Sequence, residues 1–304
     1  MKDLQKSVLG RTGLEVSRLG FGAMEIRGPR IWGGRPVTDG EAERILNAVL
    51  DAGINFIDTA YDYGLSEAYI GQFISHRRSE YILATKCGCT VVNAGDHDET
   101  PHVWTRDNLL HNIDESLRRM KTDYVDLLQL HNPSLDQTEE GNLVEVLQEI
   151  QATGKARWIG ISSTLPHLTS YIESGMFDSF QIPYSALERG HETLIAKAAE
   201  AGAGTIIRGG VGRGEPGFGL GNQERWDVWE KAQLDELVDE GESRTGFLLR
   251  FTLSHPGMTT TIVGTKNPEH LAENIRIAQK GPLSASVYEE AKKRLQEQGQ
   301  GPIA

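Results

Sequence analysis

Apolar and polar positions follow two regular patterns along this chain, and the first is a series of short, nearly continuous apolar runs. Each run ends in a polar residue or a glycine, and eight of them occur, at residues 19–24, 54–59, 81–86, 124–131, 156–162, 179–184, 204–209 and 260–266. Runs of this length are typical of strands that are buried on both faces of a parallel sheet.

The second pattern lies between these runs, where apolar residues recur at helical spacing. It covers residues 41–53, 105–120, 142–154, 192–202 and 269–279, and several of these segments close on a glycine, as helix C-termini often do. Alternating strands and helices predict a parallel α/β sheet, and eight repeats favour a closed (β/α)8 TIM barrel over an open, doubly wound sheet. No G-x-G-x-x-G turn follows the first strand, which argues against a Rossmann fold.

The remaining segments complete the predicted architecture. Residues 7–20 alternate around a turn at Arg11-Thr12-Gly13 and predict an N-terminal β-hairpin, while residues 284–298 predict an extra C-terminal helix. The glycine-rich segment 208–223 predicts an irregular, mobile loop on the barrel rim. No linker or low-complexity tract interrupts the chain, so residues 1–304 are expected to form one domain.

Composition narrows the classes of partner. The formal charge of -12 argues against binding to nucleic acid or to an anionic membrane surface, and favours a small-molecule substrate. The first residues lack an apolar signal core, and no stretch approaches the roughly 20 apolar residues of a membrane span, so a cytoplasmic protein is expected. Cys87 and Cys89 are the only cysteines, too few for a disulfide framework, and are expected to be reduced and without a role.

Ionisable residues stand where three consecutive predicted strands end. Asp58, Lys86 and His131 end the second, third and fourth strands, and Tyr63 follows Asp58 by five positions. Each residue alone has an ordinary structural explanation, such as a turn cap or a solvated rim position. In a TIM barrel, however, the chemistry lies at the carboxyl ends of the strands, where these four side chains would meet.

Together the four side chains make a proton-transfer unit. An ammonium group at Lys86 would lower the pKa of the Tyr63 phenol, a carboxylate at Asp58 would keep Lys86 protonated, and His131 could position a substrate oxygen. Such a unit protonates an oxygen while a hydride arrives from elsewhere, and a nicotinamide cofactor supplies hydride. Within residues 58–64, which include Asp58 and Tyr63, the Tyr61 side chain is expected to pack and the Asp62 side chain to face water.

The assembled motifs resemble the aldo-keto reductase family over nearly the whole chain. The resemblance is carried by VLGRTGLEVSRLGFGAM, INFIDTAYDYGLSEAYIG, ATK, VDLLQLHNPS, GISS and IVGTKNPEHLAENI. It implies a barrel closed at its bottom by the hairpin, and NAD(P)H-dependent reduction of an aldehyde or ketone, or the reverse oxidation. It also implies that Tyr63 is the general acid, that Lys86 and Asp58 tune it, and that His131 orients the carbonyl.

The resemblance further implies a cofactor site. Its predicted residues are Ala23, Met24, Ser162, Ser163, Gln181, Arg208, Gly209, Val211, Arg213, Gly264, Thr265, Lys266, His270, Glu273 and Asn274. Three positions depart from the usual pattern: Ser163 replaces an asparagine, Arg208 replaces a tyrosine that stacks under the nicotinamide in many relatives, and the third is His270. Lys266 would meet a 2′-phosphate although His270 replaces a usual arginine, so NADPH is the expected cofactor and NADH is possible.

Two tryptophans are the candidates for the substrate pocket. Trp32 follows the first strand, and Trp104 ends a long segment at 87–104. A flat indole at a barrel rim can bury an apolar substrate at small entropic cost. The acidic and histidine residues within 87–104 could suggest a metal site, but a solvated rim loop is preferred because no turn fixes ligand geometry, and no metal is expected.

Two other functions stay open at this point. Lys86 could form a Schiff base in a barrel lyase, or the chain could bind cofactor with negligible turnover, as a protein resembling the potassium-channel β subunits would. Substrate identity, the direction of the reaction and the choice between monomer and homo-oligomer are not given by the sequence.

Overall fold

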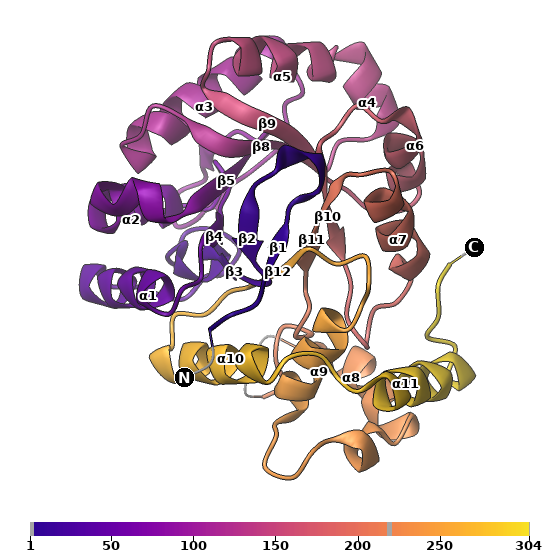
Figure 1. Cartoon of the computed structure of the whole chain (residues 1–304). Helices are drawn as coiled ribbons and strands as arrows, with labels where there is room; N and C mark the ends of the chain where they lie inside the picture. Colours follow the sequence, from indigo (N-terminus) through magenta and orange to yellow (C-terminus); the bar gives the residue numbers. More distant parts are fainter. Residues whose placement is uncertain (1–2, 218–220, 304) are drawn as a thin grey trace.

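The computed structural model describes residues 3–217 and 221–303, and its centre is a closed eight-stranded barrel (Figure 1). All neighbouring barrel strands pair in parallel. In chain order they are β3 (Leu19–Gly22), β4 (Phe56–Asp58), β5 (Ile82–Cys87), β8 (Val125–His131), β9 (Ala156–Ser162), β10 (Ser179–Pro183), β11 (Gly204–Arg208) and β12 (Thr260–Val263). The predicted (β/α)8 barrel is confirmed.

Helices surround this barrel on the outside (Figure 1). They are α1 (Asp39–Asp51), α2 (Ser66–Phe73), α3 (Arg106–Met120), α4 (Leu135–Glu140), α5 (Leu143–Ala152), α6 (His167–Ser174), α7 (Glu192–Glu200), α8 (Gln223–Lys231), α9 (Arg244–Leu253), α10 (Pro268–Lys280) and α11 (Ala285–Glu297). Short 3-10 turns add η1 (Gly10–Thr12), η2 (Ala23–Ile26), η3 (Ser75–Glu80) and η4 (Leu234–Leu237). The extra C-terminal helix is α11. None of the helices in the part of the chain that the structure describes is long and apolar enough to cross a membrane.

Local sequence signals set where helices begin. Thr38 accepts a hydrogen bond from the backbone of Glu41, and the Glu41 carboxylate accepts one from the backbone of Thr38, which forms a capping box at α1. Asn267 caps α10, and Pro268 occupies its first turn, where the missing N–H costs nothing. Two predicted strands were too long, because residues 23–26 turn into η2 and the residues after Val263 form the loop before α10.

The predicted N-terminal hairpin is β1 (Lys6–Val8) paired with β2 (Glu15–Ser17), and it lies across one end of the barrel (Figure 1). Leu9 and Val16 are fully buried in a core inside the barrel, which they share with Phe56, Ala84, Leu127 and Ile206. Arg11 fixes the turn by donating to the carbonyl of Ala201 at 2.7 Å. The hairpin therefore plugs the end of the barrel opposite to the strand ends that carry the ionisable groups.

Two loops at the other end differ from expectation in detail. Residues 87–104 contain a small hairpin, β6 (Val92–Asn93) with β7 (Asp98–Glu99), and Arg30 holds Asp98 in an ion pair of 2.6 Å. The loop is thus tied to the barrel rim, although its tip is exposed as predicted. In the glycine-rich segment, α8 begins at Gln223, and residues 218–220 lie outside the described residues.

Candidate active site

The carboxyl ends of β4 and β5 bring a lysine and a carboxylate into direct contact. Lys86 Nζ donates to Asp58 Oδ2 at 2.5 Å and to the Thr59 carbonyl at 2.8 Å, and both charged side chains are almost fully buried. Burial alone would lower the pKa of Lys86, but the Asp58 carboxylate and the nearby Tyr63 phenol raise it above its ordinary value. The lysine is therefore a fixed cation at neutral pH.

Two glutamines complete the shell around Asp58. Gln129 and Gln181 donate to Asp58 Oδ1 at 3.1 and 2.8 Å, from β8, which neighbours β5, and from β10 across the barrel. Gln129 was not predicted, although its signal is visible as a polar residue two positions before His131, between Leu128 and Leu130. Because alternate residues of a strand share one face, it points into the barrel as His131 does. Gln181, predicted to hold a carboxamide, contacts Asp58 in this structure.

Tyr63 lies over this pair. Lys86 Nζ is 5.0 Å from the centre of the phenol ring, and the rings of His131 and Trp32 meet the phenol edge-on with centroids 5.9 and 5.8 Å away. The pKa of Tyr63 is raised by burial, with smaller opposing contributions from Lys86 and Arg208. The expected lowering of this pKa was wrong in its net direction, because the cost of desolvating a phenolate exceeds the attraction of the neighbouring cations.

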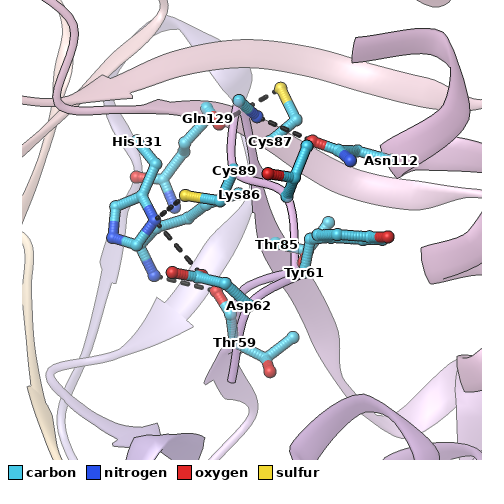
Figure 2. A network of polar contacts seen from close by, with 12 residues as sticks. Thr59, Tyr61, Asp62, Thr85, Lys86, Cys87, Cys89, Asn112, Gln129 and His131 are labelled. Carbon is cyan, nitrogen blue, oxygen red and sulfur yellow. Dashed lines mark hydrogen bonds and ion pairs between the residues drawn. The ribbon is translucent and has the colours of Figure 1, made fainter. Parts of the chain in front are cut away.

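Asp62 does not face water as predicted. Its side chain is 2% exposed, and Asp62 Oδ1 lies 3.3 Å from His131 Nδ1 (Figure 2). The residue turns inward because the tight turn after β4 directs both Asp62 and Tyr63 towards the barrel mouth, where a basic ring is available. Burial would raise the pKa of Asp62, but the contact with His131 lowers it overall, so this carboxylate is ionised. Tyr61 packs as expected, beneath the Arg119 guanidinium.

The cysteines have different surroundings. Both are free and buried, as expected, and the Cys87 sulfur faces the Gln129 carbonyl at 3.6 Å. Cys89 Sγ instead lies 3.3 Å from His131 Nδ1 (Figure 2). Burial, together with the Asp62 charge, raises the pKa of Cys89, which keeps it a thiol. The position of Cys89 in the sequence gives no sign that it belongs to the site. Its burial next to His131 is visible only in the structure.

The predicted nicotinamide-side residues gather at neighbouring strand ends. Ser162 and Ser163 are buried at the end of β9, and the Ser163 amide donates to the Gln181 carbonyl at 3.1 Å. Ala23 and Met24 lie in η2, whose backbone is held by the Ser66 hydroxyl at 2.6 Å from the Ala23 carbonyl. These residues and the ionisable group therefore share one end of the barrel.

Arg208 ends β11 and lies partly buried at the same mouth. Burial lowers its pKa, while electrostatic interactions with Tyr63 and Glu188 act in the opposite direction. The following residues turn sharply, with left-handed backbone at Gly209 and Arg213. Val211 lies between them and is partly buried, whereas Arg213 is exposed.

The segment between β12 and α10 brings the other predicted cofactor residues together. Gly264 is exposed and Thr265 is buried, and Lys266 Nζ donates to the Pro36 carbonyl at 2.7 Å, with Glu41 Oε1 at 3.8 Å. The predicted cofactor residues on α10 are exposed or partly buried: His270, Glu273 and Asn274. Glu273 accepts a hydrogen bond from Ser243 at 2.6 Å.

The two tryptophans lie on opposite sides of the ionisable group. Trp32 is half exposed and contacts Tyr63, whereas Trp104 stacks on His102 with ring centroids 5.3 Å apart. His102 in turn meets His131 edge-on at 5.8 Å. A left-handed Gly88 allows this arrangement, because a Cβ there would collide with the Trp104 ring. Trp32 therefore lies directly against Tyr63, whereas Trp104 reaches His131 only through His102.

Comparison with known proteins identifies one family. Residues 18–295 match the model of the Aldo/keto reductase family. The chain is 30% identical to the aldo-keto reductase YhdN of Bacillus subtilis (strain 168), covering 88% of this chain and 87% of that protein. It is 31% identical to the NADH-specific methylglyoxal reductase of Escherichia coli (strain K12), covering 90% and 93%. Among solved structures, the holo form of an aldo-keto reductase from Bacillus halodurans matches with TM-score 0.84 and 28% identity, covering 99% of this chain and 97% of that one.

Proposed function

Because the chain belongs to the aldo-keto reductase family and is thus an oxidoreductase, we propose that it reduces an aldehyde or ketone to an alcohol with NADPH, or catalyses the reverse oxidation. The observation that carries the proposal is the cluster at the mouth, where Lys86 contacts Asp58 at 2.5 Å beneath the Tyr63 ring and beside His131. In this proposal Tyr63 is the general acid and base.

The residues present fit a nicotinamide dinucleotide. Ser162 and Ser163 offer buried hydroxyls beside the ionisable group, and the start of α10, like any helix N-terminus, favours an anion. Between these two places, Arg208 and Arg213 supply positive charge. When bound, the dinucleotide would supply a hydride to the carbonyl carbon.

The protein's own part is the proton. As the carbonyl carbon gains the hydride, the Tyr63 O–H bond breaks and the proton passes to the carbonyl oxygen, which leaves a phenolate at Tyr63. Lys86 stabilises that phenolate, since its ammonium is 5.0 Å from the ring and cannot move away from Asp58. In the oxidation direction the same phenolate accepts the alcohol proton. Asp58 therefore acts through Lys86, and its task is to hold the cation in place.

His131 would set the direction of the substrate oxygen. Its ring lies edge-on to Tyr63, with Asp62 and Cys89 both against Nδ1. An imidazole fixed on one side in this way presents its other nitrogen in a defined direction. A carbonyl oxygen held by His131 and Tyr63 would then receive its proton along a preset path.

The preference for NADPH rests on Lys266. Its ammonium carries three donors and uses one on the Pro36 carbonyl, so two remain for a 2′-phosphate. Glu41 at 3.8 Å weakens that preference, because a second anion there would repel the phosphate. NADH remains possible on this ground, and one relative is itself named an NADH-specific reductase.

The Schiff-base alternative is disfavoured by the geometry of Lys86. A nucleophilic lysine must be neutral and accessible to the substrate. Lys86 is fully buried and paired with Asp58, and its pKa is raised above the ordinary value. Borohydride trapping of a substrate adduct at Lys86 would reverse this assignment.

A matched pair of tyrosine variants tests the function. Tyr63→Phe removes the proposed acid, and we expect kcat for NADPH-dependent reduction of a screened panel of aldehydes and ketones to fall by about 100-fold or more. Tyr61→Phe, two residues away, removes a hydroxyl whose contact is with His111 and should keep kcat within about 3-fold of the parent. Equal losses in both variants, or no loss in Tyr63→Phe, would refute the acid role and favour a binding protein.

A further inference from the structure

A second group of potential ligands lies on the outer side of His131. Cys89, His102 and His131 each direct one ligand atom to a common point, and these atoms all lie within 4.8 Å of one another. This set differs from the acidic residues at the tip of the 87–104 loop, where His97 Nδ1 pairs with its neighbour Asp96. Among the described residues, no other group of histidine, cysteine and acidic side chains converges in this way.

Asp62 offers a fourth donor beside this group, next to His131. Its Oδ1 is buried, has no hydrogen-bond donor in good geometry among the described residues, and lies 3.3 Å from His131 Nδ1. Cys89 Sγ lies 3.3 Å from that same nitrogen. The His131 ring can donate from Nδ1 to only one of these neighbours, and the Cys89 thiol is only a weak donor. A carboxylate oxygen buried without a donor is costly, and a cation would remove the cost.

The spacing suits a tetrahedral ion. Zinc binds sulfur at about 2.3 Å and nitrogen or oxygen at about 2.0–2.2 Å, which places ligand atoms roughly 3.4–3.8 Å apart along the edges of a tetrahedron. The two measured edges are 3.3 Å, and His102 needs only a small inward movement. One thiolate, one carboxylate and two neutral imidazoles around a divalent ion give a complex with no net charge, which suits a buried position.

The backbone around Cys89 and His102 is already fixed. The two residues face each other across an isolated antiparallel bridge, and the Thr90 and Val103 amides donate across it, at 2.9 and 2.8 Å. From α3, Asn108 donates to the Val103 carbonyl at 2.8 Å. His102 is exposed, so an ion can enter from solvent. The two ligands are therefore held in place, and one side of the site is open. Binding of an ion would cost little conformational entropy.

We propose that Cys89, His102, His131 and Asp62 form a binding site for a thiophilic divalent cation of the zinc class, and that occupation of this site inhibits the enzyme. Binding exchanges the Cys89 S–H bond for a metal–sulfur bond and releases one proton to solvent, with no change of oxidation state. The ion holds the His131 ring against Asp62 and Cys89 and draws His102 over it. The inhibition rests on the proposed function, because the ion would fix His102 over the His131 ring that is proposed to hold the substrate oxygen; the binding does not.

The test measures binding without turnover. Purified, reduced and metal-free enzyme is titrated with zinc against a chromophoric chelator, and one equivalent is expected to bind. Cys89→Ser and His102→Gln should each weaken zinc at least ~10-fold, since even second-shell losses at metal sites cost this much. Cys87→Ser is the matched control, because its sulfur faces the Gln129 carbonyl, and it should bind zinc as the parent does. Magnesium, which prefers oxygen ligands, should not compete.

Cobalt identifies the ligands directly. A thiolate-to-cobalt absorption band is expected in the parent and in Cys87→Ser, and its absence from the parent would overturn the proposal. Equal zinc affinity in His102→Gln and the parent would also overturn it, and this variant changes an exposed side chain, so its folding is not at risk. Zinc should lower carbonyl reduction in the parent more than in His102→Gln, each relative to its own metal-free rate. Tight, Cys89-dependent binding without any reductase activity would contradict the proposed function and leave the site standing.

Discussion

The two halves of the barrel mouth are built differently. At β4, β5 and β8 the charged groups are buried and hydrogen-bonded to one another, with Lys86, Gln129 and Gln181 all directed at one carboxylate. At β11 and β12 the charged groups, Arg208, Arg213 and Lys266, are partly buried or exposed, and Lys266 donates to the backbone carbonyl of Pro36. The first half is organised before any ligand binds, which suits proton transfer. The second half keeps its charges available, which suits a ligand that must come and go.

Of the predicted changes, replacement of Lys86, the buried cation of the first half, should have the largest effect on stability and activity. Lys86→Met leaves the Asp58 carboxylate buried without a counter-ion, which should lower the free energy of unfolding by about 3–5 kcal/mol. The loss would be measured by urea unfolding, and kcat should fall with it because the Tyr63 phenolate is no longer stabilised. The double variant Lys86→Met with Asp58→Asn removes both charges and should regain part of the stability but none of the activity. Equal stability of the single and double variants would contradict a paired, charged Asp58.

Gln129→Met tests the buried half without touching a charge. It removes one of two amide donors to Asp58 Oδ1, and we expect the free energy of unfolding to fall by about 1–3 kcal/mol. Gln223→Met, on the exposed start of α8, is the control and should stay within about 0.5 kcal/mol of the parent. An equally small loss of stability in Gln129→Met would mean that Gln181 alone satisfies the Asp58 carboxylate.

Lys266→Ala tests the open half. If Lys266 binds the 2′-phosphate, the dissociation constant of NADPH should rise roughly 10-fold, the value of one charge-assisted hydrogen bond, while that of NADH stays unchanged. Fluorescence titration of both reduced cofactors would measure this. Arg276→Ala, on the exposed side of α10, should leave both dissociation constants unchanged. A parallel loss for NADPH and NADH would assign Lys266 to a general structural role.

Arg208→Tyr should give the smallest change. A guanidinium beside an oxidised, cationic nicotinamide repels it, so the parent should disfavour the oxidised cofactor relative to the reduced one by about 1 kcal/mol, or roughly 5-fold in the ratio of dissociation constants. The tyrosine variant should remove this difference. Arg213→Tyr, in the following loop, should weaken both forms alike. An unchanged ratio in Arg208→Tyr would sink the repulsion hypothesis.

The fold and the members of the ionisable group could be predicted from the sequence, because strand periodicity and the residues at strand ends are local signals. Asp58, Lys86 and His131 could be placed from them, and the structure brings them together. Asp62 was misplaced because the direction of a side chain in a tight turn depends on tertiary neighbours. Cys89 and His102 were missed as a pair because they meet only through a bridge between two irregular segments. The net pKa of Tyr63 likewise depends on burial, which local pattern does not reveal.

The hairpin plug described above also decides how the enzyme exchanges protons with its surroundings. Leu9 and Val16 fill the barrel axis with hydrocarbon, so no chain of water can run through the barrel to the underside of Tyr63. In the proposed mechanism, Tyr63 would therefore regain its proton through the same opening that admits the substrate. Reprotonation of Tyr63 and release of the alcohol would then use the same opening one after the other. Slow product release would delay both steps.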